Sequence, residues 1–205
     1  LKDCEADNRF ATPDEQIVLS KYVGWGGLAQ AFDEHNVAWH NEYEELKDVL
    51  SIEEYAAAKG SVLNAHYTSK TVIDGIYKAL TRFGVKGNNR ILEPAMGTGN
   101  FFGFMPQEIV DGAKLYGVEL DRVTGKIATK LYPQAKIQIK GFEETAFQDN
   151  SFDLMVTNVP FGGYTVFDPD YNKYNFYIHD YFIAKGIDKI KPNGLMAVIT
   201  SKGTL

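Results

Sequence analysis

The sequence of 205 residues has little cysteine, no long apolar run and no excess of positive charge. Cys4 is the only cysteine, so no disulfide can form within the chain. No apolar run approaches the roughly 20 residues that cross a bilayer, and no charged-then-apolar leader precedes the first expected helix. These absences predict a cytoplasmic protein with no membrane partner.

The formal net charge of −6 disfavours a chain that grips a nucleic-acid backbone strongly by itself, although it leaves room for a local basic groove or a basic partner domain. The four histidines show no metal-ligand spacing, so we expect no metal site. With 44% hydrophobic and 23% charged residues the chain is an ordinary globular sequence. It starts without Met and stops just after an apolar run, so we expect a piece of a longer polypeptide.

Residues 1–63 predict a helical arm. Thr12-Pro13-Asp14-Glu15 and Ser51-Ile52-Glu53-Glu54 are both capping boxes that begin helices, the second of them running to about residue 58. Between them, Gly24-Trp25-Gly26-Gly27 predicts a tight turn with an anchoring Trp, because no phosphate-loop lysine follows it. Nothing in the arm resembles catalytic chemistry.

From residue 64 onward, short β-favouring runs alternate with helical patterns. Alternation with short loops predicts an α/β fold with a largely parallel sheet. The expected strands are residues 90–93, 115–121, 135–139 (at an edge), 152–157 and 195–200. The expected helices begin at residue 68 or 69, at 122 and at 174, the last of them ending at 190 before a turn over residues 191–194.

The run from Glu93 through Gly97 and Gly99 is the pattern of a strand–turn–helix nucleotide site. Small residues there let backbone N–H groups approach a ligand. The third glycine of the dinucleotide fingerprint is missing, and an acid directly before the loop suits a cationic amine better than a pyrophosphate. Taken alone, Gly-x-Gly is also the pattern of an ordinary turn.

Three further segments carry candidate binding residues. The helix that starts at Thr68 or Ser69 presents free N–H groups to a ligand carboxylate, although a plain cap with Tyr67 packed beside it fits the same residues. Glu119 ends the second strand, where an acid typically accepts hydrogen bonds from ribose hydroxyls. Phe142 and Glu143 follow the third strand, where they could sandwich and contact an adenine.

With Asn158-Val159-Pro160-Phe161 after the buried strand, the order of elements resembles that of N6-adenine DNA methyltransferases, from about residue 64 to the end. Residues 93–101 resemble that family's Asp-Pro-Ala-Cys-Gly-Thr-Gly loop, and residues 117–121 its ribose-binding strand end. The tetrapeptide resembles Asn-Pro-Pro-Tyr/Phe, and residues 66–68 the leading cofactor motif. The arm, with residues 22–27 and 64–68, is also similar to the methylase portion of large helicase–methylase proteins of conjugative mobile elements.

The resemblance implies a Rossmann-like methyltransferase domain over residues 64–205, without its final strands and target-recognition domain. It implies DNA as a partner, through missing recognition or helicase regions, and gives no oligomeric state. It implies S-adenosyl-L-methionine as the cofactor. The residues implied to bind it are Tyr67, Thr68, Glu93, Pro94, Ala95, Gly97, Gly99, Asn100, Phe101, Glu119, Leu120, Phe142 and Glu143.

The same resemblance assigns methyl transfer to the tetrapeptide. The Asn158 side-chain carbonyl and the Val159 backbone carbonyl accept hydrogen bonds from the amino group of adenine, which favours the tetrahedral nitrogen of the transition state. Phe161, after Pro160, stacks on the base once it is flipped out of the duplex. No strong general base is required for this reaction, and none is evident.

Two positions depart from the family pattern. Val159 stands where the first proline is usual, which keeps the carbonyl but loses the ring's restraint on φ. Gly141 stands where an Asp is usual, and Glu143 is the expected substitute for its adenine contact. Two alternatives stay open. The same tetrapeptide serves enzymes that methylate glutamine amides or RNA bases, and the Val159 departure also suits a catalytically silent cofactor-binding or scaffolding module.

Overall fold

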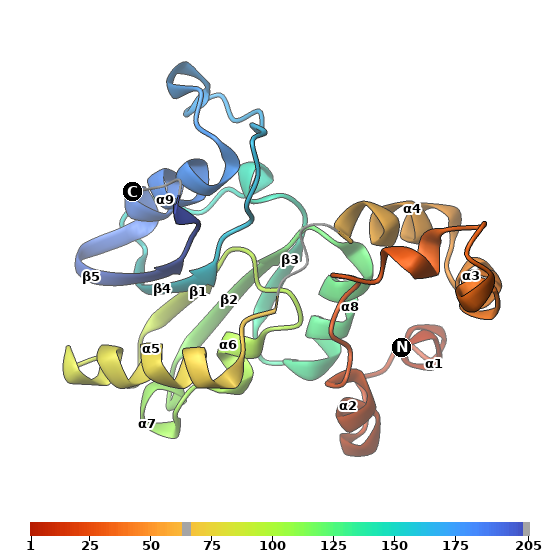
Figure 1. The fold of residues 1–205 in the computed structure, drawn as a ribbon. Helices are drawn as coiled ribbons and strands as arrows, with labels where there is room; N and C mark the ends of the chain where they lie inside the picture. Colours follow the sequence, from red (N-terminus) through yellow and green to blue (C-terminus); the bar gives the residue numbers. More distant parts are fainter. Residues whose placement is uncertain (63–66, 203–205) are drawn as a thin grey trace.

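A five-stranded parallel sheet forms the centre of the computed structural model, which describes residues 1–62 and 67–202. The strands lie in the order β3-β2-β1-β4-β5, and each neighbouring pair is parallel (Figure 1). This confirms the predicted α/β fold and the edge position of the third strand. Their bounds are β1 Arg90–Glu93, β2 Lys114–Glu119, β3 Lys136–Ile139, β4 Phe152–Asn158 and β5 Ile190–Ile199.

The last strand begins earlier than its sequence indicates. We expected a turn over residues 191–194, but β5 already pairs with β4 at Ile190, opposite Phe152. An irregularity in the pairing absorbs the extra residues before Leu195 meets Leu154. Asn193 takes a φ of 67° there, a conformation that asparagine tolerates better than most residues. The turn-forming residues therefore make a bulge within the strand instead of ending the pairing.

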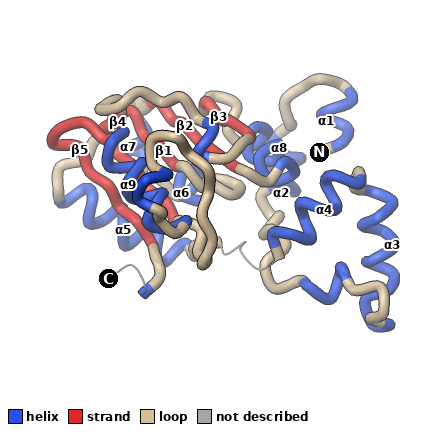
Figure 2. The backbone as a smooth tube through the Cα atoms, turned by 90° about the horizontal axis from the view of Figure 1, so that it is seen from above, coloured by secondary structure: helices blue, strands red, loops and turns tan. Residues whose placement is uncertain are grey.

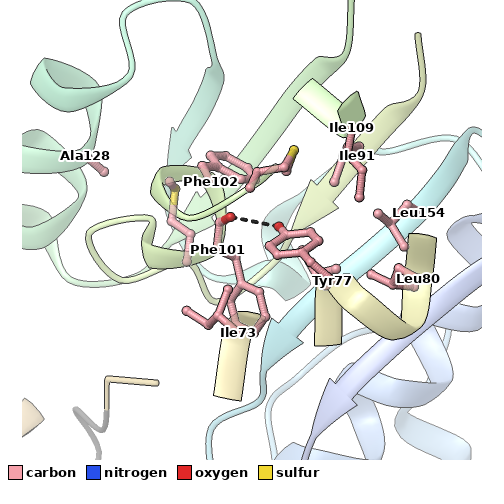
Figure 3. Packing of buried hydrophobic residues seen from close by; sticks show 12 residues of the cluster. Ile73, Tyr77, Leu80, Ile91, Phe101, Phe102, Ile109, Ala128 and Leu154 are labelled. Atoms are coloured by element: carbon pink, nitrogen blue, oxygen red, sulfur yellow. Dashed lines mark hydrogen bonds between the residues drawn. The ribbon is translucent and has the colours of Figure 1, made fainter. Parts of the chain in front are cut away.

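One face of the sheet is covered by α5 (Lys70–Arg82), α6 (Asn100–Gly103) and α7 (Gln107–Val110). Ile73, Tyr77 and Leu80 of α5 form the apolar face that the helical spacing predicts, and all three are buried. The Tyr77 hydroxyl donates to the Phe101 carbonyl oxygen at 2.8 Å, as Figure 3 shows. This bond satisfies a buried hydroxyl and joins the start of α6 to α5.

The opposite face is covered by α9 (Ile178–Lys189), which starts four residues later than expected. Asn175 adopts a left-handed φ of 51° after the short helix η4 (Asn172–Tyr174), and this interrupts the helical run. Tyr174 and Tyr177 are therefore more than half exposed. The remaining apolar positions of the predicted stripe are buried in the core, namely Ile178, Tyr181 and Phe182.

The arm lies beyond β3, at the end of the sheet opposite β5 (Figures 1 and 2). Both capping boxes are present, on Thr12 with Glu15 and on Ser51 with Glu54. The expected boundary between residues 63 and 64 lies outside the described residues. The arm elements are α1 Lys2–Ala6, α2 Pro13–Leu19, η1 Ala29–Phe32, η2 Val37–Trp39, α3 His40–Val49 and α4 Ile52–Ser61.

Helix α8 (Arg122–Leu131) lies between the sheet and the arm. Its Ala128 packs into the core on the α5 face of the sheet, whereas Val123 and Ile127 pack against arm residues that include Cys4 and Leu19. The arm is therefore joined to the sheet through a shared apolar layer. Within residues 1–62 and 67–202, no helix has the length and apolar character needed to cross a membrane.

Candidate functional site

A cavity of about 490 Å³ opens at the carboxyl ends of the central strands. Glu93 ends β1, Glu119 ends β2 and Asn158 ends β4, and all three line this cavity. In doubly wound sheets, ligands bind where the strand order reverses, which here is between β1 and β4. The fold therefore places the cavity at the position expected for a ligand site.

The structure brings nearly all the predicted site residues to this one cavity. The exception is Gly99, which is the N-cap of α6 with a φ of 84°. A side chain at Gly99 would meet the Tyr132 ring at 2.5 Å, and the Tyr132 hydroxyl donates to the Gly99 carbonyl oxygen at 2.8 Å. Gly99 thus fixes the loop after β1 against Tyr132, on the side of the loop that faces away from the cavity. The predicted residues that line the cavity are Tyr67, Thr68, Glu93, Pro94, Ala95, Gly97, Asn100, Phe101, Glu119, Leu120, Phe142, Glu143, Asn158, Val159, Pro160 and Phe161.

The loop after β1 is fixed across the end of β2. Gly97 has a φ of 55°, a left-handed conformation that favours glycine. Its N–H donates to Glu119 Oε2 at 2.8 Å, and the N–H of Met96 donates to the Val118 carbonyl oxygen at 3.0 Å. The two acidic strand ends and the glycine loop therefore form one connected unit.

The two acids at the strand ends have raised pKa values. Glu93 is 2% exposed, and its Oε2 accepts no hydrogen bond within the described part of the chain. Burial raises the pKa of Glu93 well above its ordinary value, and the nearby Glu119 charge raises it further. Burial also raises the pKa of Glu119 to about 7, although N–H groups of Asp121 and Gly97 act to lower it. A cationic ligand in the cavity would lower the free-energy cost of ionising these two buried acids.

The segment before α5 reaches the cavity through Tyr67 and Thr68. Ser69 is the N-cap, which is one of the two expected positions, but its side chain makes no capping hydrogen bond. The Asn100 side-chain amide donates to the Thr68 carbonyl oxygen at 3.4 Å, which links this segment to the start of α6. His66, the first residue of the predicted leading motif, lies outside the described residues.

Phe142 and Glu143 reach the cavity from the short helix η3 (Phe142–Glu144). The Phe142 ring is 1% exposed and packs 5.1 Å from the Phe182 ring between centroids, so the core already takes most of its surface. The Glu143 carboxylate occupies the space that a side chain at Gly141 would fill. The Glu143 carboxylate therefore lies where the side chain of an Asp at position 141 would lie.

The tetrapeptide is held at the end of β4 by the neighbouring strand. Asn158 lies opposite Ile199 of β5, and the N–H of Val159 donates to the Ile199 carbonyl oxygen at 3.1 Å. A proline at position 159 could not make this bond. The hydrogen bond restrains the main chain at the position where the family's proline ring would do so.

Sequence reasoning missed a whole wall of the cavity. Thr124 of α8 contributes to it, and Tyr164 and Val166 come from the segment after the tetrapeptide. The arm, from which we expected no site residue, contributes Gly24, Trp25, Ala57, Gly60 and Ser61. The glycine-rich turn at residues 24–27 was the only local signal that pointed there. Among the described residues, no group of three or more His, Cys, Asp or Glu side chains could hold a metal ion.

Comparison with known proteins finds a family and a relative. A sequence model described as N-6 DNA Methylase matches residues 43–205. The chain is 32% identical over 200 residues to the protein of Escherichia phage P1 named Defense against restriction protein B. That alignment covers 94% of this chain and 7% of the phage protein, so the chain spans only a small part of its relative.

Two solved structures of similar fold are methyltransferases. A Listeria monocytogenes protein assigned to the class I S-adenosylmethionine-dependent methyltransferases matches with a TM-score of 0.55 at 19% identity, over 83% of this chain and 61% of that one. A SAM-dependent O-methyltransferase from Thermotoga maritima matches with a TM-score of 0.50 at 16% identity, over 67% of this chain and 47% of that one. At these identities the likeness shows the fold.

Proposed function

Because this chain belongs to the N-6 DNA methylase family, we propose that it transfers a methyl group to the N6 amino group of a flipped adenine in DNA. Its fold and family make it an S-adenosyl-L-methionine-dependent methyltransferase. The observation that supports the adenine target is the tetrapeptide Asn158-Val159-Pro160-Phe161, which lines the same cavity as Glu93 and Glu119. The proposed DNA contacts outside this cavity belong to other regions of the protein.

The cavity residues fit S-adenosyl-L-methionine, which supplies an electrophilic methyl group when bound. Oε2 of the buried Glu93 carboxyl accepts no hydrogen bond within the described chain, and this carboxyl would hold the cofactor's positive charge. Glu119 accepts two backbone N–H groups and keeps further lone pairs for the ribose hydroxyls. Gly97 lets the Tyr67 ring pack closely against the cofactor loop, because a side chain at Gly97 would lie 3.0 Å from that ring.

Methyl transfer to an aromatic amine requires a more nucleophilic nitrogen. The Asn158 side-chain carbonyl and the Val159 main-chain carbonyl would accept hydrogen bonds from the two amino N–H groups as the nitrogen becomes tetrahedral. The Val159 N–H is bonded to Ile199, so the carbonyl of that residue is held in place before the target arrives. Phe161 would stack on the flipped base, and its place on the cavity wall allows this.

The test is methyl transfer from labelled S-adenosyl-L-methionine to DNA by the full-length protein. We expect label on adenine, and a loss of at least 100-fold in rate for Asn158→Ala with cofactor binding retained, a size typical of a lost transition-state hydrogen bond. Gln148→Ala removes an exposed amide away from the cavity and should leave the rate unchanged.

Two outcomes would contradict the proposal. Label on RNA or on protein glutamine instead of DNA would show that the methyl acceptor is another planar nitrogen. Bound cofactor without any Asn158-dependent transfer would identify a silent cofactor-binding module. The net charge of −6 and the valine at position 159 are features that favour this second outcome.

A further inference from the structure

A single aromatic ring joins the arm to the cofactor loop. Gly24 in the arm has a φ of 70°, and a side chain there would lie 2.5 Å from Tyr67 Cε2. A side chain at Gly97 would lie 3.0 Å from Tyr67 Cε1. Because Cε1 and Cε2 are on opposite edges of the ring, Tyr67 lies between the arm and the cofactor loop, and both glycines are needed for this close approach.

The arm turn that carries Gly24 is packed firmly. The Trp25 ring makes edge contacts with Tyr22 and Phe32, at centroid distances of 5.7 and 5.5 Å. The Tyr22 hydroxyl lies 3.5 Å from Oγ1 of Thr124, a residue of α8 that also lines the cavity. The Trp25 indole nitrogen is buried and has no hydrogen-bond acceptor among the described residues. A packed wall residue therefore carries an unused donor.

Contacts away from the cavity dock the arm on α8. Lys126 Nζ lies 2.8 Å from a Glu5 oxygen and 3.1 Å from a Glu54 oxygen. Lys130 Nζ donates to the Arg9 carbonyl oxygen at 2.8 Å, on the same side of α8. These bonds and the shared apolar layer attach the arm to α8 through residues other than Gly24 and Trp25.

We propose that the arm is part of the S-adenosyl-L-methionine site. Gly24 positions Tyr67 against Gly97, and Trp25 with the end of α4 forms the outer wall of the cofactor cavity. The Trp25 indole N–H donates to an acceptor of the bound cofactor. Cofactor affinity thus depends on a turn that is remote from the cofactor loop in the sequence.

Two glycines of the same turn provide a matched pair of variants. Gly24 and Gly27 both have positive φ, at 70° and 77°, so an alanine strains the backbone equally at either position. Only at Gly24 does the added methyl group meet Tyr67, because a side chain at Gly27 meets nothing within 4 Å. Calorimetric titration of the full chain with S-adenosyl-L-methionine should show at least tenfold weaker binding for Gly24→Ala, and a change within twofold for Gly27→Ala. Equal losses in both variants, or none in Gly24→Ala, would overturn the proposal.

Two further measurements keep the proposal testable if Gly24→Ala unfolds. Trp25→Phe keeps an aromatic ring and removes the N–H, so binding should weaken about tenfold while the melting temperature stays within a few degrees. Cofactor binding should also slow amide hydrogen exchange at Ala57, Gly60 and Ser61 of α4, which line the cavity. Unchanged affinity in Trp25→Phe together with unchanged exchange would contradict the proposal. These readouts need no DNA, so they are independent of the adenine target.

Discussion

The carboxyl group of Glu119 should make cofactor affinity depend on pH. Burial raises its pKa from 4.5 to about 7, so the free protein is half protonated there at neutral pH. An ionised carboxylate is acceptor-only and can receive both ribose hydroxyls, whereas the protonated acid turns one oxygen into a donor. We therefore expect tighter binding as Glu119 loses its proton.

The size of the effect follows from the ionised fraction. With a pKa of about 7, roughly 10% of Glu119 is ionised at pH 6 and roughly 90% at pH 8, so the association constant should rise about tenfold, or about 1.4 kcal/mol. 5′-Methylthioadenosine is the appropriate probe, because it carries the ribose but lacks the titratable amine of the cofactor. Its affinity then reports Glu119 without the cation that Glu93 would receive.

Calorimetric titrations at pH 6, 7 and 8 measure this rise directly. Glu119→Gln should bind more weakly and show no change across the range, since it has no proton to lose. Glu144→Gln changes an exposed acid outside the cavity and should keep the wild-type slope. An affinity that is flat or falling with pH in the wild type, or a slope that survives in Glu119→Gln, would refute the assignment of Glu119 to the ribose.

Three further predictions concern stability, measured by urea denaturation. In the folded protein the pKa of Glu119 is raised from 4.5 to about 7. Its contribution to the free energy of unfolding is therefore complete below about pH 4.5 and is lost as pH rises through 7. Between pH 5 and 8 the free energy of unfolding of the wild type should fall by on the order of 2 kcal/mol, whereas that of Glu119→Gln should not fall in this way. Val159→Pro removes the N–H that donates to Ile199 and should cost about 1 kcal/mol, and an unchanged stability would show that this bond does not restrain the tetrapeptide. Lys185→Met leaves the buried Asp168 carboxylate without its ion pair and should lower the free energy of unfolding by about 3–5 kcal/mol. The double variant with Asp168→Leu should recover much of that loss. If it does not, lost packing and not the unpaired charge is responsible.

The carboxyl edge of the sheet could be predicted because its residues follow a local rule. Glu93 and Glu119 each end a β-favouring run, and the carboxyl ends of parallel strands meet at one edge. The tetrapeptide at residues 158–161 follows a third such run. Once the alternation of strands and helices indicated a parallel sheet, these segments had to lie close together, and the structure has them on one cavity.

Features that depend on distant contacts or on backbone conformation could not be predicted in this way. The helix expected from residue 174 fails because Asn175 turns left-handed, which side-chain periodicity does not record. The turn expected before Leu195 becomes a bulge because pairing with β4 continues past it. The part of the cavity wall that comes from the arm was missed because it depends on the contact between Gly24 and Tyr67, which are close in space but distant in sequence.

The two most deeply buried acids of the sheet domain show why the cavity points to a cationic ligand. Asp168 is 4% exposed and receives the Tyr181 hydroxyl at 2.6 Å and Lys185 Nζ at 2.9 Å, and against the effect of burial these bonds hold its pKa below the ordinary value. Glu93 is buried as deeply, yet no side chain of the described protein neutralises it and its pKa is raised. Within the described residues, the buried Asp168 carboxylate therefore has side-chain donors, whereas the buried Glu93 carboxyl has no cationic side chain beside it. The unpaired acid lies at the cavity wall, so its cost to stability is explained if the partner is the cofactor.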